Sequence, residues 1–267
     1  MIKKFFVTLI ACSAFLVSCK NDDDSRIDKE TKIPIEERNA LDDKAIEQYL
    51  ADHYFSPGDT INGKVVRVGI IMKYDTEEGN KDDKYPSLKS MAVQDPAGYW
   101  YAKNPYQKES SEGKTIKSND DTKIHISFKA NYFRATNDIT SENNPTKKHY
   151  GVLGTYGQVT YDTGDGSPFS DPDFYYYIPN QEEAKNGVKR EHIELKNFSV
   201  ALKHFKTTER SLQDNFSFQG VIILPSRLAF ARNNYFVGTG LTEYSSFRDA
   251  SFIFNFEIPQ IEDRVKK

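Results

Sequence analysis

The sequence contains very little cysteine. Its 267 residues include only Cys12 and Cys19, both close to the N-terminus. We expect Cys12 to be removed with a signal peptide, so the remaining chain would keep one cysteine and could form no internal disulfide. Because disulfides support many small secreted proteins, their absence indicates that a packed apolar core stabilises this fold.

Patterns for several common kinds of chemistry are also missing. The sequence has no glycine-rich phosphate loop, no Gly-x-Ser-x-Gly turn and no histidine pair at metal-ligand spacing. The net charge is −3, and no basic patch interleaves with aromatic residues, so we expect no nucleic-acid partner. We predict no cofactor and read His125 as structural.

Four aspartates in one region suggest calcium, because calcium is bound by several oxygen atoms from a flexible loop. Their spacing does not match the EF-hand pattern, and Asp-Gly and Asp-Pro pairs are also ordinary turn chemistry. We therefore predict no metal site. These residues are Asp162, Asp165, Asp171 and Asp173.

The N-terminus has the pattern of a bacterial lipoprotein signal. Two lysines precede an apolar stretch at residues 5–17, and Leu16-Val-Ser-Cys19 matches the lipoprotein box. The motif implies cleavage after residue 18 and lipid attachment to Cys19, which would anchor the protein without spanning the bilayer. The alternative is an ordinary secretory signal with an incidental cysteine.

Acidic residues follow at once, in the stretch Lys20-Asn-Asp-Asp-Asp-Ser25. This run resembles the surface-export signal of Bacteroidota lipoproteins. It implies a lipid-anchored protein of the outer membrane, exposed at the cell surface, with the periplasmic face as the alternative. We expect residues 19–40 to form a flexible acidic linker.

The remaining chain favours a β-rich fold, since 13% of the residues are aromatic. Residues 41–96 are expected to form an N-terminal extension, with a helix at 41–54 and a strand at 65–72. Further strands are predicted at 98–102, 124–133, 221–224 and 251–258, and a central helix with its lead-in at 194–205.

The C-terminal strands carry a family resemblance. Val221–Leu224 is an apolar run that Pro225 ends, and a Pro-Ser-x-Leu-Ala-aromatic turn leads to Phe230. The later strand 251–258 places Phe252, Phe254, Phe256 and Ile258 on one face. This arrangement resembles the C-terminal half of an FKBP-type peptidyl-prolyl cis-trans isomerase domain.

The resemblance implies an α+β fold, in which a half-open antiparallel sheet wraps around a short central helix. The domain would cover residues 97–262, with an insertion at about 145–190. Within the insertion, the apolar run Phe174–Ile178 would either pack on the domain or be offered to a partner.

The resemblance also implies an aromatic substrate pocket. In it, the backbone amide of Leu195 would hold the substrate carbonyl and Phe198 would form the floor. Two expected tyrosines are phenylalanine here, at Phe128 and Phe230, and the expected aspartate is Thr140. The alternative is that the apolar members belong to the core. The predicted pocket residues are Phe128, Ile139, Thr140, Leu195, Phe198, Phe230 and Phe254.

Such a pocket needs no acid, base or nucleophile, because it would lower the barrier to peptide-bond rotation by desolvation and shape. One hypothesis is a weakly active isomerase or folding factor that acts on proline-containing or unfolded polypeptides. A second is a non-catalytic subunit of an outer-membrane complex, such as a type 9 secretion or other β-barrel translocon. A third is a surface lipoprotein that binds a carbohydrate or peptide.

Overall fold

The computed structural model describes residues 33–61, 63–75, 84–107, 109–136, 151–153, 168–211, 217–233 and 247–265. The chain divides into two units, Met1–Ile33 and Pro34–Lys267, and the description below concerns the second. The signal sequence and Cys19 lie outside the described residues. Within the described part, no helix is long and apolar enough to cross a membrane.

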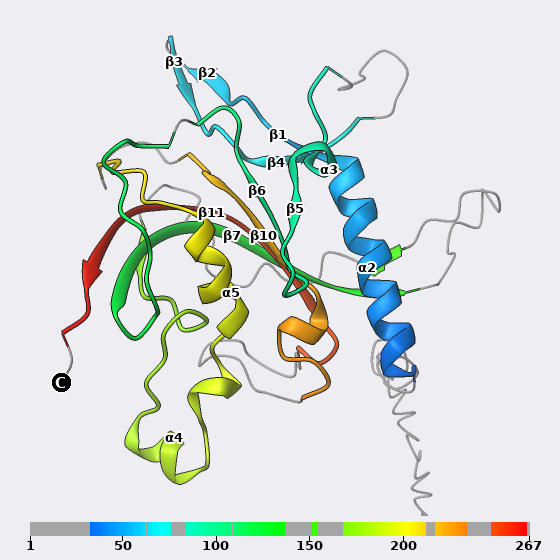
Figure 1. Cartoon of the computed structure of the whole chain (residues 1–267), viewed down its shortest axis with the longest axis vertical. Helices are drawn as coiled ribbons and strands as arrows, with labels where there is room; N and C mark the ends of the chain where they lie inside the picture. Colours follow the sequence, from blue (N-terminus) through cyan, green and yellow to red (C-terminus); the bar gives the residue numbers. More distant parts are fainter. Residues whose placement is uncertain are drawn as a thin grey trace, which may run out of the picture. The chain divides into compact units, whose positions relative to one another are not determined.

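The main sheet is antiparallel throughout (Figure 1). Its two long strands, β7 (Thr122–Thr136) and β11 (Ser251–Asp263), pair along most of their length and curve around the short helix α5 (Lys196–Ala201). Strand β9 (Phe169–Ser170) also pairs with β7. The order across the sheet is β5 (Val93–Gln94), β6 (Trp100–Lys103), β10 (Gly220–Leu224), β11 (Ser251–Asp263), β7 (Thr122–Thr136) and β8 (Gly151–Leu153).

Among the described residues helices are few and mostly short, so this part of the chain has a mixed α+β fold with antiparallel sheets. Two small ribbons precede the main sheet: β1 (His53–Phe55) pairs with β4 (Ile71–Lys73), and β2 (Asp59–Ile61) pairs with β3 (Lys64–Val66). The α-helices are α2 (Ile35–Asp52), α3 (Leu88–Met91), α4 (Gln181–Lys185) and α5 (Lys196–Ala201). Single 3₁₀ turns are η1 (Arg190–His192), η2 (Leu202–His204) and η3 (Ser226–Leu228).

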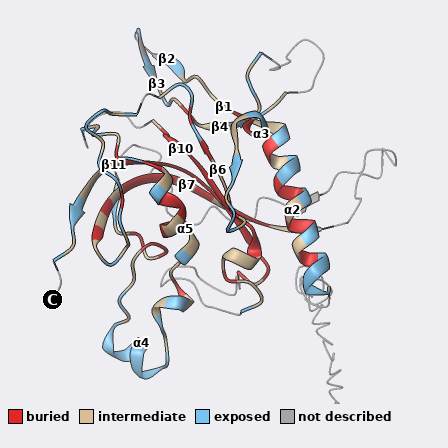
Figure 2. Ribbon diagram, in the orientation of Figure 1, coloured by how far each residue is buried: buried red, intermediate tan, exposed pale blue. Residues whose placement is uncertain are grey.

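Residues 251–259 of strand β11 are buried on both faces (Figure 2). The predicted face, which carries Phe254 and Phe256, packs toward α5 in the aromatic core. The opposite face is covered by the N-terminal extension, because Asn255 donates from Nδ2 to the backbone oxygen of Gly69 and accepts from the amide of Ile71. The alternating pattern predicts one buried face, and the extension buries the second.

The predicted strand at 65–72 is wrong, since two separate strands, β3 and β4, occupy this region. Between them the backbone turns at Arg67 and Gly69, which have φ angles of 55° and 82°. A Cβ atom on Gly69 would lie 2.2 Å from the backbone oxygen of Phe218. The break therefore allows the backbone at Gly69 to approach the main sheet closely.

Both predicted helices have different bounds in the structure. Helix α2 begins at Ile35 instead of Leu41, so it includes residues assigned above to the linker. Pro34 precedes its first turn, and the buried Arg38 donates from Nη1 to the backbone oxygen of Ala135, 2.5 Å away. The contact of Arg38 with β7 thus stabilises the first turn of α2, which has little apolar pattern of its own. The central helix is shorter than expected and ends in the 3₁₀ turn η2.

Part of the predicted insertion is described, at residues 151–153 and 168–190. It supplies β8, β9 and α4. Phe174 and Tyr175 are buried in the core, whereas Ile178 is 70% exposed. The start of the apolar run therefore packs on the domain.

Candidate functional site

Three of the predicted pocket residues meet in the centre of the core. Phe128 comes from β7, Phe198 from α5 and Phe254 from β11, and all three are fully buried. The inward-facing positions of two neighbouring strands and the buried side of α5 bring them together. These three of the predicted pocket residues therefore belong to one region of the core, and whether they form a substrate pocket stays a prediction.

A fourth ring, that of Phe174, fills the space among them. Its centroid lies 5.0 Å from that of Phe128, 5.2 Å from Phe198 and 5.0 Å from Phe254. The rings of Phe198 and Phe254 are themselves 4.5 Å apart. Aromatic rings at these separations are in direct contact. We call Phe128, Phe174, Phe198 and Phe254 the aromatic cluster.

The aromatic cluster leaves no room for a substrate ring between its members. Carbon atoms in contact are about 3.5–4 Å apart, so a proline ring between two aromatic faces would separate their centroids by about 7 Å. The observed separations are 4.5–5.2 Å. In this arrangement the cluster is a packed part of the core.

Leu195 directly precedes α5 and is also buried. Its backbone amide donates to the backbone oxygen of Phe174, 2.8 Å away. The resemblance assigns this amide to a substrate carbonyl, but here it has a partner within the chain. Phe174 therefore takes both places that the resemblance assigns to a substrate. Its ring packs among the predicted pocket residues, and its backbone carbonyl accepts from the Leu195 amide.

The remaining predicted pocket residues are not part of this group. Phe230 is buried and contacts Phe252 and Phe247, with ring centroids 5.9 and 6.2 Å away. It is joined to the aromatic cluster through Phe252, which stacks on Phe254 at 6.1 Å. Ile139 and Thr140 lie outside the described residues.

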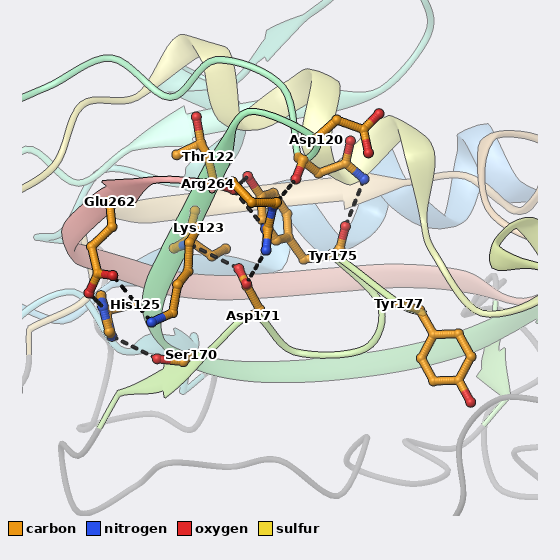
Figure 3. A network of polar contacts seen from close by, with 12 residues as sticks. Asp120, Thr122, Lys123, His125, Ser170, Asp171, Tyr175, Tyr177, Glu262 and Arg264 are labelled. Atoms are coloured by element: carbon orange, nitrogen blue, oxygen red, sulfur yellow. Dashed lines mark hydrogen bonds and ion pairs between the residues drawn. The ribbon is translucent and has the colours of Figure 1, made fainter. Parts of the chain in front are cut away.

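The segment that carries Phe174 is fixed at its start by Asp171 (Figure 3). This residue has a positive φ of 46°, and its amide donates to the backbone oxygen of Ile124. Its Oδ1 accepts from the amide of Ile124 at 3.1 Å, and its Oδ2 accepts from Nη1 of Arg264 at 2.7 Å. The carboxylate thus joins the segment to both β7 and the end of β11.

Arg264 has further partners around the same segment. It donates from Nε to the backbone oxygen of Asn119 and from Nη2 to that of Thr122. Its guanidinium carbon lies 3.4 Å from the ring centroid of Tyr176, a cation–π contact. The Tyr175 hydroxyl also donates to Thr122, and burial raises the pKa of Tyr175.

The far end of the segment is held by Glu194. One of its oxygens, Oε1, accepts from the amide of Tyr177 at 2.6 Å and from Nε of Arg190 at 2.8 Å. Residues 171–177 are therefore fixed at both ends, with Phe174 between them. The sequence signal was the aromatic run 174–178, which did not reveal that its first ring would enter the predicted pocket.

Of the four aspartates considered for calcium, Asp171 and Asp173 lie among the described residues. Asp171 is paired with Arg264, and its neighbour Asp173 is partly buried, which raises the pKa of Asp173. Asp162 and Asp165 lie outside the described residues. Among the described residues, no three His, Cys, Asp or Glu side chains are grouped as metal ligands would be.

No model of a protein family matches the chain, and no curated protein matches it either. The functional argument therefore depends on the residues of the site.

Proposed function

We propose that this chain is a lipid-anchored, FKBP-like protein of the outer membrane that acts as a binding subunit without isomerase activity. The observation that carries this proposal is the contact between Phe198 and Phe254, at 4.5 Å, with Phe174 packed against both. A proline ring would have to separate side chains that already form the centre of the core.

The architecture supports the FKBP-like part of the proposal. Strand β10 ends at Pro225, the Pro-Ser turn forms η3, and the Phe-rich strand β11 pairs with β10. The sheet bends around α5, which supplies Phe198 (Figure 1). These are the features that the resemblance implies for such a domain.

The energetics argue against turnover. Opening the cluster would separate several fully buried aromatic rings, and removing such a side chain from a core costs about 3–5 kcal/mol. It would also break the hydrogen bond from the Leu195 amide to Phe174. Substrate binding would have to offset both costs before any barrier could be lowered.

The N-terminal motif points to the class of partner. Lipid on Cys19 and the acidic run after it would hold the domain at the outer membrane, where β-barrel assemblies are the available integral partners. We propose that the domain binds such a β-barrel complex, of the type 9 secretion or another translocon class.

The first test is a protease-coupled isomerisation assay with Xaa-Pro tetrapeptides. We expect the wild-type protein to give the uncatalysed rate. Turnover that Phe198→Ala and Phe230→Ala abolish would instead establish an isomerase. Phe55→Ala is the matched control, because Phe55 is a buried phenylalanine of the N-terminal extension outside the aromatic cluster.

A second arm of the same test asks for the partner. The tagged chain is crosslinked in cells and purified from outer membranes, and a β-barrel protein is expected among the captured proteins. A Cys19→Ala chain, which cannot be lipidated, should lose this capture. Capture of soluble unfolded clients without a barrel would favour the folding-factor hypothesis.

A further inference from the structure

Three neighbouring strands bring a serine, a histidine and a glutamate to one face of the sheet. Ser170 in β9 pairs with His125 in β7, and Glu262 in β11 pairs with Lys123, two residues before His125. Paired residues in antiparallel strands point to the same face, as do residues two apart in one strand. The registers alone therefore place these four side chains together, as Figure 3 shows.

The hydrogen bonds join three of them in a line. The hydroxyl of Ser170 lies 3.0 Å from Nδ1 of His125, and Nε2 of His125 lies 2.8 Å from Oε1 of Glu262. The hydrogen bond from His125, together with Lys123, holds the pKa of Glu262 below its usual value. Glu262 is thus a carboxylate and can only accept a hydrogen bond.

The carboxylate fixes the proton on the histidine. Nε2 must donate to Glu262, so in the neutral ring Nδ1 carries the lone pair and faces the Ser170 hydroxyl. The serine then donates its proton to the histidine. A hydroxyl, a base and an orienting carboxylate in this order form the arrangement that activates a serine for attack.

We propose that Ser170 is a nucleophile for acyl transfer, with His125 as its general base and Glu262 as the residue that positions His125. This inference does not depend on the aromatic cluster, because none of these side chains belongs to it. It assigns a chemical role to the middle of the insertion, where β9 contributes only Phe169 and Ser170.

The step is that of ester hydrolysis. Ser170 Oγ forms a bond to the ester carbonyl carbon while its proton passes to Nδ1 of His125. The bond to the alcohol oxygen then breaks, and the histidine returns the proton to the departing alcohol. Water attacks the acyl-serine with the same histidine as base, which releases the carboxylic acid and restores Ser170.

The exposure of Ser170 defines the substrate class. The Lys123 amine lies 3.3 Å from Oε2 of Glu262 and helps to keep this carboxylate ionised, so that it can orient His125. Ser170 is exposed on the sheet surface. A short acyl ester that projects from its carrier, such as an acetyl ester, is the group this serine can reach.

The test uses a fluorescent fluorophosphonate, which labels activated serines, on the purified full chain. We expect labelling that mass spectrometry maps to Ser170 and that Ser170→Ala removes. His125→Gln and Glu262→Gln should each slow it at least about tenfold, since they remove the base and its orientation. Ser118→Ala is the matched control, because Ser118 donates to the carboxylate of Asp121 at 2.6 Å and should leave the labelling unchanged.

Circular dichroism and thermal melting establish that each variant is folded before its rate is compared. Hydrolysis of p-nitrophenyl acetate is then followed for the same set, and loss of turnover with Ser170→Ala is expected. The proposal is overturned if the folded wild-type chain is not labelled at Ser170. It is equally overturned if His125→Gln is labelled at the wild-type rate, or if labelling occurs without ester turnover.

Discussion

At the scale of single residues, the protonation of Asp42 makes the stability of the fold depend on pH. This residue of α2 is fully buried, and its Oδ2 accepts from the amide of Ser226 at 3.1 Å. Burial raises the pKa of Asp42 to about 6, although the hydrogen bond and the nearby Arg38 act in the opposite direction. The folded protein therefore favours the protonated form more than the unfolded chain does.

The sign of the effect on stability follows from this shift. Protonated Asp42 contributes to the free energy of unfolding. This contribution is fully present below pH 3.8 and is lost as the pH rises through about 6. A shift of this size corresponds to about 2–3 kcal/mol. We expect the free energy of unfolding of wild type, relative to Asp42→Asn, to decrease by about that amount between pH 4 and pH 7.

Urea denaturation of both proteins across this pH range measures the difference. Asp43→Asn serves as the control, because Asp43 is partly exposed and pairs with Arg227 at the surface. An Asp42→Asn protein whose stability follows wild type at every pH would contradict the assignment.

At the scale of elements, Asn255 is one of the side chains that join the N-terminal extension to the main sheet. Asn255 donates from Nδ2 to the backbone oxygens of Gly69 and Gly220, and its Oδ1 accepts from the amide of Ile71. It lies in β11, on the face opposite the aromatic cluster. Its amide thus satisfies backbone groups of both the ribbon and β10.

Replacing this side chain should weaken the contact between the two parts. Asn255→Ala leaves buried backbone groups without their partner, and each such group costs about 1–3 kcal/mol. We expect the unfolding free energy to fall by about 2–4 kcal/mol, with faster hydrogen exchange in β1 and β4 than in β7. The exposed Asn186 provides the control, since Asn186→Ala removes no buried contact.

At the scale of the whole molecule, strand β11 links the main sheet, the N-terminal extension and the segment that contains Phe174. Strand β11 pairs with β10 on one side and β7 on the other, and it carries Asn255 toward the extension. Directly after it, Arg264 holds the segment that contains Phe174. Folding of the sheet, the extension and this segment should therefore be a single cooperative event.

Truncation separates this expectation from independent folding of the parts. A chain that ends at Ala250 lacks β11, and we expect it to show no cooperative thermal transition by circular dichroism. A chain that ends at Arg264 loses the highly exposed Val265 and should melt as wild type does. A stable folded core in the shorter chain would show that β11 is dispensable.

The sequence by itself determined the features that short stretches encode. Pro225 cannot donate to a sheet ladder, and it ends β10 where predicted. The apolar run at 221–224 and the Phe alternation at 251–258 predicted a strand and the inward face of another correctly. The expectations for Cys19, the membrane face and the partner remain predictions, because residues 1–32 lie outside the described part.

The tertiary structure decided the points that depend on distant segments. It broke the predicted strand at 65–72 so that Gly69 could approach Phe218, and it extended α2 to Ile35 through the contact of Arg38 with β7. It also packed Phe174 against Phe254, eighty residues later in the chain. Periodicity reports only which side of an element is apolar, whereas the neighbour that covers that side is selected by packing of the whole core.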